Sequence, residues 1–233
     1  MNLTGEWPPS TKPFRSNPPE GTVGIVLPIR DNLKFFKLAF HSILDFSDYR
    51  FMLTVVDNMS GFPTRQYLES IRRNHPVNVL QYQNPHSQGA EWNLGLQFMF
   101  AFANVQFGVV LTPDVVVEPN WLSRLVRSVN TLDNPAGIVS PFSNEAVPSR
   151  LSPFCMAFKR LTWERLAGFD EGFHEARPCM SDFEERALKA GFRLSVNRDV
   201  YVHHFERNGY RPDPDHVAQD FEHEAAKRRE VTV

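Results

Sequence analysis

The chain has 233 residues, of which 42% are hydrophobic and 22% are charged, an ordinary composition for a globular protein. This composition excludes collagen-like, coiled-coil and wholly disordered chains. The 25 Lys and Arg residues and 27 Asp and Glu residues leave a formal net charge of -2. Because no basic excess is available to neutralise a phosphate backbone, we expect no nucleic-acid partner.

The cysteines and the apolar runs indicate the compartment. Cys155 and Cys179 have no metal-binding spacing and are too few for a disulfide framework, which favours a reducing environment. Apolar runs such as 109–111 and 115–117 are far shorter than the ~20 residues that a membrane-spanning helix needs. Residues 1–14 lack the basic and apolar pattern of a secretory signal. We expect no transmembrane segment and a cytoplasmic location.

The order of the patterns along the chain predicts the fold class. Five prolines within residues 1–20 predict an irregular N-terminal arm over 1–21. From Thr22 onward, short β-branched runs alternate with stretches of helical period, as in stacked β-α units. The alternation predicts an α/β fold with a mainly parallel central sheet flanked by helices.

The expected elements follow in chain order. The first part of the chain predicts strands over 23–27, 51–56, 77–82 and 107–111, and helices over 33–46, 63–74, 89–104 and 121–132. A fifth strand is expected to begin at Ile138. Beyond about residue 140 the rhythm changes, and the patterns predict strands over 154–158, 193–196 and 200–204 and helices over 161–167 and 181–190. The mixed charges near the C-terminus predict a solvated helix or tail over 206–233.

Polar residues follow each of the first four expected strands. In an open parallel sheet, ligands bind beyond the carboxyl ends of the strands. The polar segments there are 28–31, 57–58, 84–89 and 112–114. Each alone is readily interpreted as an ordinary turn, but four at one edge indicate a binding site, and a helix start near Gly89 would favour an anion.

Asp114 is the most informative of these residues. It leaves an apolar strand and is followed by three valines, so its carboxylate needs a compensating cation or donor. A hard divalent ion binds through one or two carboxylates while sharing phosphate oxygens with a substrate. The alternative is a turn Asp that caps the helix near Pro119.

Two further groups have both a structural and a chemical interpretation. Ser181 and Glu184 have the spacing of a capping box, which would place Asp182 in the first turn of its helix. There Asp182 either favours the helix dipole alone or acts as a general base on a substrate hydroxyl. His203 and His204 end a strand, where only one imidazole can face the site and join a carboxylate as a metal ligand.

Seven segments resemble, in the same order, the successive motifs of family 2 glycosyltransferases with the GT-A fold. They are VGIVLPIRDN, LTVVDNMSG, NPHSQGAEWNLGL, VVLTPDVVVEPNWL, FCMAFKRLTWERLAGFDEGF, SDFEERALKAGFRL and DVYVHHF. The resemblance covers about 22–205, which we expect to form one glycosyltransferase domain. VVDNMS and DVYVHHF are most similar to bacterial rhamnosyltransferase-like members.

The resemblance implies roles for individual residues. Those that match segments around the nucleotide are Pro28, Ile29, Arg30, Asp57 and Asn58 for the base and ribose, Gly89 and Asn93 for the ribose and diphosphate, and Thr112 and Asp114 for the metal-binding motif. By the same resemblance Asp182 is the catalytic base, and His204 completes the shell of a Mn²⁺ or Mg²⁺ ion.

The chain departs from the family pattern at three places. Thr112 and Pro113 occupy the first two positions of the metal motif, so one carboxylate remains there. Ser181 stands where many members have Glu. Phe205 and Glu206 stand where Gly-Ser is common, so the loop over the diphosphate is expected to differ.

The resemblance implies an inverting glycosyltransferase. The expected reaction moves a sugar from a nucleoside diphosphate donor, UDP- or dTDP-linked, to a glycan or other hydroxyl acceptor, in glycan or polysaccharide synthesis. The departures at Thr112 and Pro113 leave open a binding module that keeps the fold and has weakened catalysis. A sugar-phosphate nucleotidyltransferase is disfavoured, because no Gly-rich phosphate loop follows the first strand.

Overall fold

The computed structural model describes residues 21–131, 137–144, 151–205 and 214–230. The strands are β1 (Thr22–Ile29), β2 (Phe51–Asn58), β3 (Val77–Tyr82), β4 (Val105–Leu111), β5 (Val115–Val117), β6 (Ile138–Ser143), β7 (Cys155–Lys159) and β8 (Leu194–His204). The helices are α1 (Leu33–Phe46), α2 (Phe62–Asn74), α3 (Gln88–Phe100), α4 (Trp121–Thr131), α5 (Arg160–Arg165), α6 (Ala176–Lys189) and α7 (Pro214–Glu230). Apart from Gly21, the predicted N-terminal arm lies outside the described residues.

The strands form one mixed sheet in the order β3-β2-β1-β4-β7-β6-β8-β5. The four strands β3, β2, β1 and β4 are parallel to one another. On the other side of β4 the pairing alternates: β7 is antiparallel to β4 and β6, β8 is parallel to β6, and β5 is antiparallel to β8. The prediction of an α/β fold with a mainly parallel sheet is confirmed, with antiparallel pairs confined to the second half.

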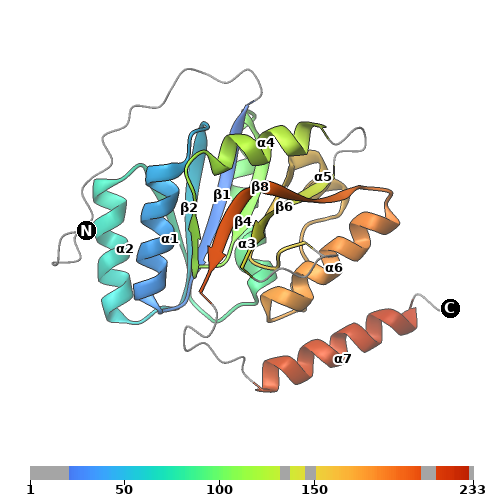
Figure 1. The fold of residues 1–233 in the computed structure, drawn as a ribbon. Coiled ribbons are helices and arrows are strands. Elements are labelled where there is room, and N and C mark those ends of the chain that lie inside the picture. Colours follow the sequence, from blue (N-terminus) through green and yellow to red (C-terminus); the bar gives the residue numbers. More distant parts are fainter. Residues whose placement is uncertain (1–20, 132–136, 145–150, 206–213, 231–233) are drawn as a thin grey trace.

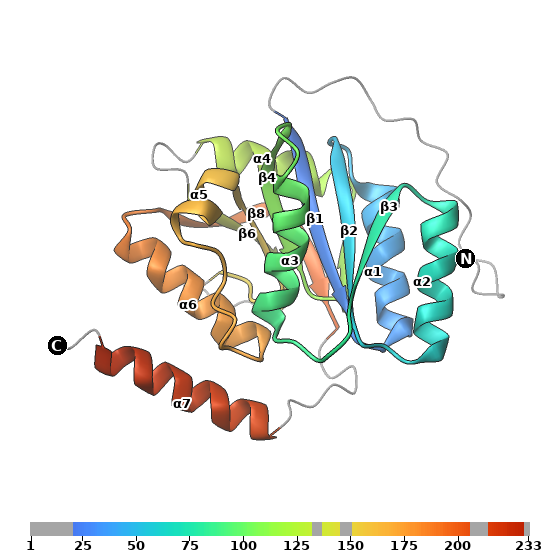
Figure 2. The same ribbon diagram turned by 180° about the vertical axis from the view of Figure 1, so that it is seen from behind.

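Helices cover both faces of this sheet. Figure 1 shows α1, α2 and α4 in front of the sheet, and Figure 2 shows α3, α5 and α6 on the opposite face. Two buried hydrophobic clusters correspond to these layers, one around Phe36, Phe40 and Trp121 and the other around Trp92, Phe158 and Phe183. Because β1 is buried along its whole length, it consists almost entirely of apolar residues.

Local sequence explains the packing of α1 and α3. In α1 the buried residues recur at helical spacing, at Phe36, Ala39, Phe40 and Ile43, so one face of the helix packs on the sheet. In α3, a Cβ atom added at Gly95 would lie only 2.6 Å from Cγ1 of Val26. The missing side chain therefore lets α3 lie directly on β1, which brings the start of α3 to the end of that strand.

Helix α6 differs from its prediction. It begins at Ala176, five residues before Ser181, so the capping box of Ser181 and Glu184 does not form and Asp182 is not in the first turn. The backbone N–H groups of His174 and Glu175 instead donate to the Asp220 carboxylate, at 2.7 and 3.0 Å. A residue of α7 thus supplies the acceptor at the start of α6.

Two other boundaries also differ. The strands expected over 193–196 and 200–204 are one strand, β8, whose register with β6 shifts between Pro141 and Phe142. Asn197 lies inside β8, and its amide donates 2.7 Å to the Ser128 hydroxyl of α4. The long helix expected to reach residue 104 ends at Phe100.

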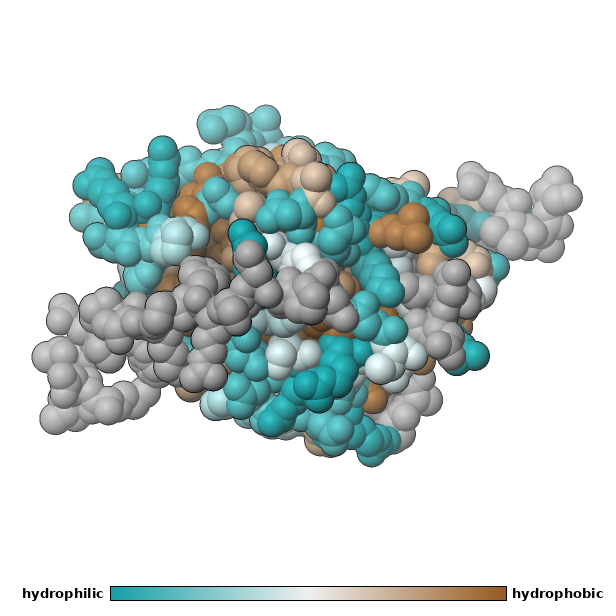
Figure 3. Space-filling view, turned by 90° about the horizontal axis from the view of Figure 1, so that it is seen from above, coloured by the Kyte–Doolittle hydropathy of each residue, from teal (hydrophilic) through white to brown (hydrophobic). Residues whose placement is uncertain are grey.

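The last described element, α7, lies beside α6 in both ribbon views (Figures 1 and 2). The face seen from above in Figure 3, where β1 begins, is mostly hydrophilic and carries separate hydrophobic patches. Among the described residues, no helix combines the length and the apolar character needed to cross a membrane.

Candidate functional site

The carboxyl ends of β1 to β4 lie at one edge of the sheet, since these strands are parallel. Pro28 and Ile29 are buried at the end of β1, and Arg30 is exposed just beyond it. Asp31 then joins this turn to the turn after β2: its N–H donates to the Ser60 hydroxyl at 2.9 Å, and its carboxylate accepts the Gly61 N–H at 2.7 Å. The two loops are therefore held together beside the strand ends.

Three of the five non-glycine residues with positive φ in the described part of the chain lie in these two loops. Asp31, Asn32 and Met59 have φ values of 56°, 46° and 61°, in the left-handed region that side chains with a Cβ rarely adopt. Such strain persists only where the surrounding structure imposes it, and it is frequent at ligand-binding sites.

Asp57 and Asn58 end β2 and are almost completely buried. Asp57 accepts the Ser60 N–H at 2.9 Å and the Gln81 amide at 3.2 Å. The side-chain oxygen of Asn58 accepts the His86 N–H at 3.0 Å, and its amide nitrogen donates to the His86 carbonyl at 2.8 Å. Asn58 therefore fixes the loop between β3 and α3 at this edge.

Glu91, which the sequence analysis did not single out, lies next to Asn58. It is only 5% exposed, and its carboxyl oxygens receive the Asn58 amide and the Gln88 amide, the latter at 2.6 Å. Burial raises the pKa of Glu91 to about 8, and hydrogen bonds from Asn58 and Gln88 and the charge of Arg30 offset only part of this effect. A buried carboxyl with a raised pKa in a cleft is a frequent feature of functional sites.

Gly89 and Asn93 connect α3 to the segment before α6. A Cβ atom at Gly89 would lie 2.6 Å from the Asp170 carbonyl oxygen, so this contact requires glycine. The Asn93 amide donates to the Phe169 carbonyl at 2.8 Å and to Glu171 at 2.9 Å, and its oxygen accepts the Phe169 N–H at 2.9 Å. Both predicted residues thus position the 169–171 turn at the start of α3.

Asp114 and His204 meet at the far end of β4. Val115 of β5 pairs with His204 of β8, which brings the His204 side chain next to Asp114, the residue before Val115. His204 Nε2 lies 3.3 Å from Asp114 Oδ2. Burial would raise the pKa of Asp114, but hydrogen bonds from His204 and Thr112 and the charge of His204 hold it below its ordinary value. The His204 ring also stacks on Phe154 at 4.4 Å, which fixes its orientation.

The histidine beside Asp114 is His204. His203 points to the opposite face of β8, where its ring lies 4.8 Å from Phe205 and its Nδ1 lies 3.2 Å from the Tyr201 hydroxyl. Within the described parts of the chain, no group of three or more His, Cys, Asp or Glu residues is placed to hold a metal ion. The Asp114 and His204 pair therefore supplies two ligands at most.

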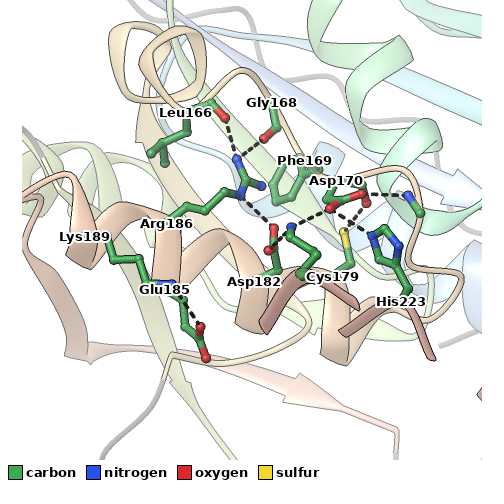
Figure 4. A network of polar contacts seen from close by, with 12 residues as sticks. Leu166, Gly168, Phe169, Asp170, Cys179, Asp182, Glu185, Arg186, Lys189 and His223 are labelled. Carbon is green, nitrogen blue, oxygen red and sulfur yellow. Dashed lines mark hydrogen bonds and ion pairs between the residues drawn. The ribbon is translucent and has the colours of Figure 1, made fainter. Parts of the chain in front are cut away.

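Asp182 lies in the second turn of α6, in a network of charged groups (Figure 4). One carboxylate oxygen accepts from Arg186 Nε at 2.7 Å, and the other accepts from the Lys227 ammonium of α7. Lys227 also donates to Asp170 at 2.5 Å. Partial burial would raise the pKa of Asp170, but hydrogen bonds from Lys227, the Gly172 N–H and His223 lower it to about 2.

The structure thus gathers most of the predicted residues into three neighbouring groups, and Asp182 lies in a separate charged network that Lys227 joins to Asp170. The first lies around Asp57 and Asn58, the second joins Gly89 and Asn93 to the turn before α6, and the third is the Asp114 and His204 pair. Trp92 connects the second group to the third, since its indole N–H donates to the Leu111 carbonyl at the end of β4 at 3.2 Å. Asp170 and Lys227 were missed, because only tertiary contacts bring them to Asp182. Arg186 was missed although its spacing of four residues from Asp182 is a local signal.

A comparison with protein families identifies the family of this chain. The model of glycosyl transferase family 2 matches residues 24–176, which is more than half of the chain. The chain belongs to this family. The match runs from Gly24 in β1 to Ala176 at the start of α6, and it includes Asp57, Asn93 and Asp114 but neither Asp182 nor His204. A comparison with curated proteins gave no match.

Solved glycosyltransferase structures share the fold at low sequence identity. TarS from S. aureus is 17% identical, with a TM-score of 0.61, over 78% of this chain and 36% of that chain. The mannosyltransferase PcManGT from Pyrobaculum calidifontis, solved with GDP-Man and Mn²⁺, is 18% identical, with a TM-score of 0.63, over 84% of this chain and 62% of that chain. GalNAc-T7, solved with UDP, GalNAc and Mn²⁺, is 14% identical, with a TM-score of 0.66, over 88% of this chain and 48% of that chain.

These similarities establish the GT-A fold of the chain. The alignments span between about a third and two thirds of the length of these three structures. Because the sequence identities are below 25%, these structures do not show which donor or acceptor this chain uses.

Proposed function

We propose that this chain is an inverting glycosyltransferase that moves a sugar from a nucleoside diphosphate sugar, UDP- or dTDP-linked, to an acceptor hydroxyl in glycan or polysaccharide synthesis. The single observation that carries the proposal is the Asp114 and His204 pair at the edge where β1, β2 and β4 end. Family membership supports the sugar transfer, and two solved relatives of the fold contain nucleotides or nucleotide sugars with Mn²⁺. In this proposal residues 22–205 form the catalytic domain, with the nucleotide half before about residue 115.

The donor would lie over the ends of β1 and β2. Pro28, Ile29 and Arg30 would border the base and ribose together with Asp57. Asn58 and Asn93 are engaged with backbone and side chains of their own loops, so they would act by shaping the pocket. Helix α3 begins at Gln88, and its N-terminus beside Gly89 would favour the diphosphate.

The residues present fit a divalent ion held jointly with the donor. Asp114 and His204 are a carboxylate and an imidazole, which Mn²⁺ accepts as ligands, and Mg²⁺ would rely more on Asp114. Thr112 lies two residues before Asp114, and its backbone N–H donates a hydrogen bond to the Phe154 carbonyl. When bound, the ion would supply positive charge next to the leaving diphosphate.

Asp182 is the proposed general base. Inversion needs one displacement, in which a positioned carboxylate accepts the proton of the acceptor hydroxyl. Asp182 is anchored by Arg186, which also donates to the Gly168 carbonyl at 2.9 Å, so the orientation of the carboxylate is fixed by its own helix.

Turnover of defined donors tests this function. UDP-, dTDP- and GDP-sugars with Mn²⁺ are incubated with mono- and oligosaccharide acceptors, and the released nucleoside diphosphate is measured. Asp182→Asn is expected to lower transfer by about 10²- to 10⁴-fold. Asp199→Asn, an exposed control on β8, should leave it unchanged. Full transfer by Asp182→Asn would reject the role of the base.

Thr112 and Pro113 favour a second candidate, a nucleotide-binding module without catalysis. Such a module would bind a nucleotide equally well with and without Mn²⁺ in a calorimetric titration, and no donor would be turned over or hydrolysed.

A further inference from the structure

Helix α7 contacts the rest of the chain through one polar face. His216, Asp220, His223 and Lys227 share this face, because they are spaced at four, three and four residues. The His216 ring stacks on His174 at 4.6 Å. Asp220 is 5% exposed, although the helix as a whole is largely exposed.

The first half of α7 is attached at the start of α6. Asp220 accepts the N–H groups of His174 and Glu175, and it lies 3.2 Å from the ring nitrogen Nδ1 of His174. These contacts seat α7 across the 170–175 segment, directly before the helix that carries Asp182.

The second half of α7 brings a cation to the proposed base. Lys227 donates to Asp170 Oδ2 and to Asp182 Oδ1, and its ammonium lies 5.5 Å from the Phe173 ring centre. Burial works against the ammonium, but hydrogen bonds to Asp170 and Asp182 raise the pKa of Lys227 above its ordinary value, so the side chain is charged at neutral pH. Figure 4 shows Asp182 between Arg186 on one side and the cluster of Asp170 and His223 on the other.

The two cations on Asp182 differ in origin. Arg186 belongs to the same helix, four residues on, and is held by the Leu166 and Gly168 carbonyls. Lys227 comes from a separate helix and is 32% exposed, so its contact can be broken without unfolding α6. Partly exposed ion pairs are individually weak and are screened by salt.

A general base needs a carboxylate lone pair that the substrate hydroxyl can reach. In the observed arrangement the Asp182 side chain is 10% exposed, Arg186 occupies Oδ2 and Lys227 occupies Oδ1. Each carboxylate oxygen has a second lone pair, but Asp182 is nearly buried and Lys227 lies against Oδ1, so an acceptor hydroxyl reaches this oxygen only after Lys227 has moved away. The proton then leaves the hydroxyl oxygen for Oδ1, and the oxygen forms the new bond to the anomeric carbon of the sugar. The bond from that carbon to the donor phosphate oxygen breaks at the same time, so the nucleoside diphosphate leaves with the bonding electrons.

We propose that α7 is a releasable autoinhibitory cover, which keeps Asp182 closed to the acceptor through Lys227. The inhibitory effect rests on the proposed role of Asp182, whereas the covering of this carboxylate can be measured without any activity. The reason is geometric: the same ammonium bridges Asp170 and Asp182, and Asp220 keeps the helix in register over them.

Carboxyl labelling tests the cover directly. The full chain is treated with a carbodiimide and glycine ethyl ester, and modification of Asp182 is quantified by peptide mass spectrometry. Lys227→Met removes the charge and keeps the length of the side chain. Arg229→Met is the matched control, because Arg229 is an exposed cation of the same helix that donates to the Ala225 carbonyl.

We expect labelling of Asp182 to rise several-fold in Lys227→Met, and in the unmodified chain at 0.5 M NaCl, but not in Arg229→Met. Transfer to an acceptor should rise about 2- to 5-fold in Lys227→Met, the change expected for release of one partly exposed ion pair. Equal labelling of the unmodified chain and Lys227→Met at low salt would overturn the cover. Increased labelling with unchanged or lower transfer would overturn the inhibition. Increased labelling with no transfer by any protein would leave the cover established and reject the proposed function instead.

Discussion

The buried carboxyl of Glu91 should make the stability of this protein depend on pH. Its pKa is about 8 in the folded chain, against an ordinary value of 4.5. Between these values the folded state binds the proton more tightly than the unfolded state, so the stabilisation is complete below about pH 4.5 and is lost as the pH rises through 8.

The size of the effect follows from the difference between the two pKa values. At about 1.4 kcal/mol for each pH unit, the span from 4.5 to about 8 corresponds to about 4–5 kcal/mol as an upper bound. Glu91→Gln removes the titration and keeps the shape of the side chain. The oxygen of the introduced amide can still accept from Asn58, and its NH₂ group can donate to Gln88 once the Gln88 amide turns over.

The measurement is urea unfolding of both proteins at whole pH steps from 5 to 9. The free energy of unfolding of the unmodified chain should fall relative to Glu91→Gln by about 1.4 kcal/mol per unit over most of this range, because all other titrating groups are common to both. Glu69→Gln serves as control, since Glu69 is exposed on α2. Parallel curves for the unmodified chain and Glu91→Gln would refute the reasoning.

Two further predictions concern packing between α3 and its neighbours. Asn93→Ala should lower the free energy of unfolding by about 3 kcal/mol, because the N–H and the carbonyl of Phe169 lose their partner in a buried site. Urea unfolding measures this change, and a loss below about 1 kcal/mol would contradict the prediction. Gly95→Ala should cost about 1–3 kcal/mol, because its Cβ would lie 2.6 Å from Val26. Adding Val26→Ala should recover part of that loss, and strict additivity of the two changes would show that the close contact is not the cause.

Most of the fold could be predicted, because its first half follows local patterns. The alternation of apolar strands and amphipathic helices predicted β1 to β4 and α1 to α4, where each element packs on its sequence neighbours. The start of α6 could not be predicted in this way. The carboxylate that accepts the Glu175 N–H at this helix start belongs to Asp220, 45 residues further along the chain. This tertiary contact, and not the local pattern of Ser181 and Glu184, determines where α6 begins.

The interior of β8 shows the same limit. Two strands were expected, over 193–196 and 200–204, but the Asn197 amide donates to Ser128 and to the Arg124 carbonyl of α4, and the strand continues through these residues. Local turn residues are compatible with a strand when another element supplies their hydrogen bonds.

The candidate site was predicted in part. The expectation that ligands bind beyond the carboxyl ends of the strands identified Asp57 and Asp114. It could not decide between His203 and His204, because a shift of one residue in the strand register exchanges the faces of the two side chains. Pairing of Val115 with His204 decides this. Glu91 and Lys227 gave no local signal, since a lone Glu in a helix and a Lys in a charged tail are ordinary surface residues until tertiary contacts bury or pair them.

Calorimetric titration of UDP, dTDP and GDP, with and without Mn²⁺, tests the donor site most directly. At least one nucleotide should bind more tightly with Mn²⁺. This dependence should be lost in Asp114→Ala and weakened in His204→Ala but not in His203→Ala, because in the proposed site only Asp114 and His204 would supply ligands to the ion. Unchanged Mn²⁺-dependent binding by Asp114→Ala, or no binding of any nucleotide to the unmodified chain, would contradict the proposed glycosyltransferase site.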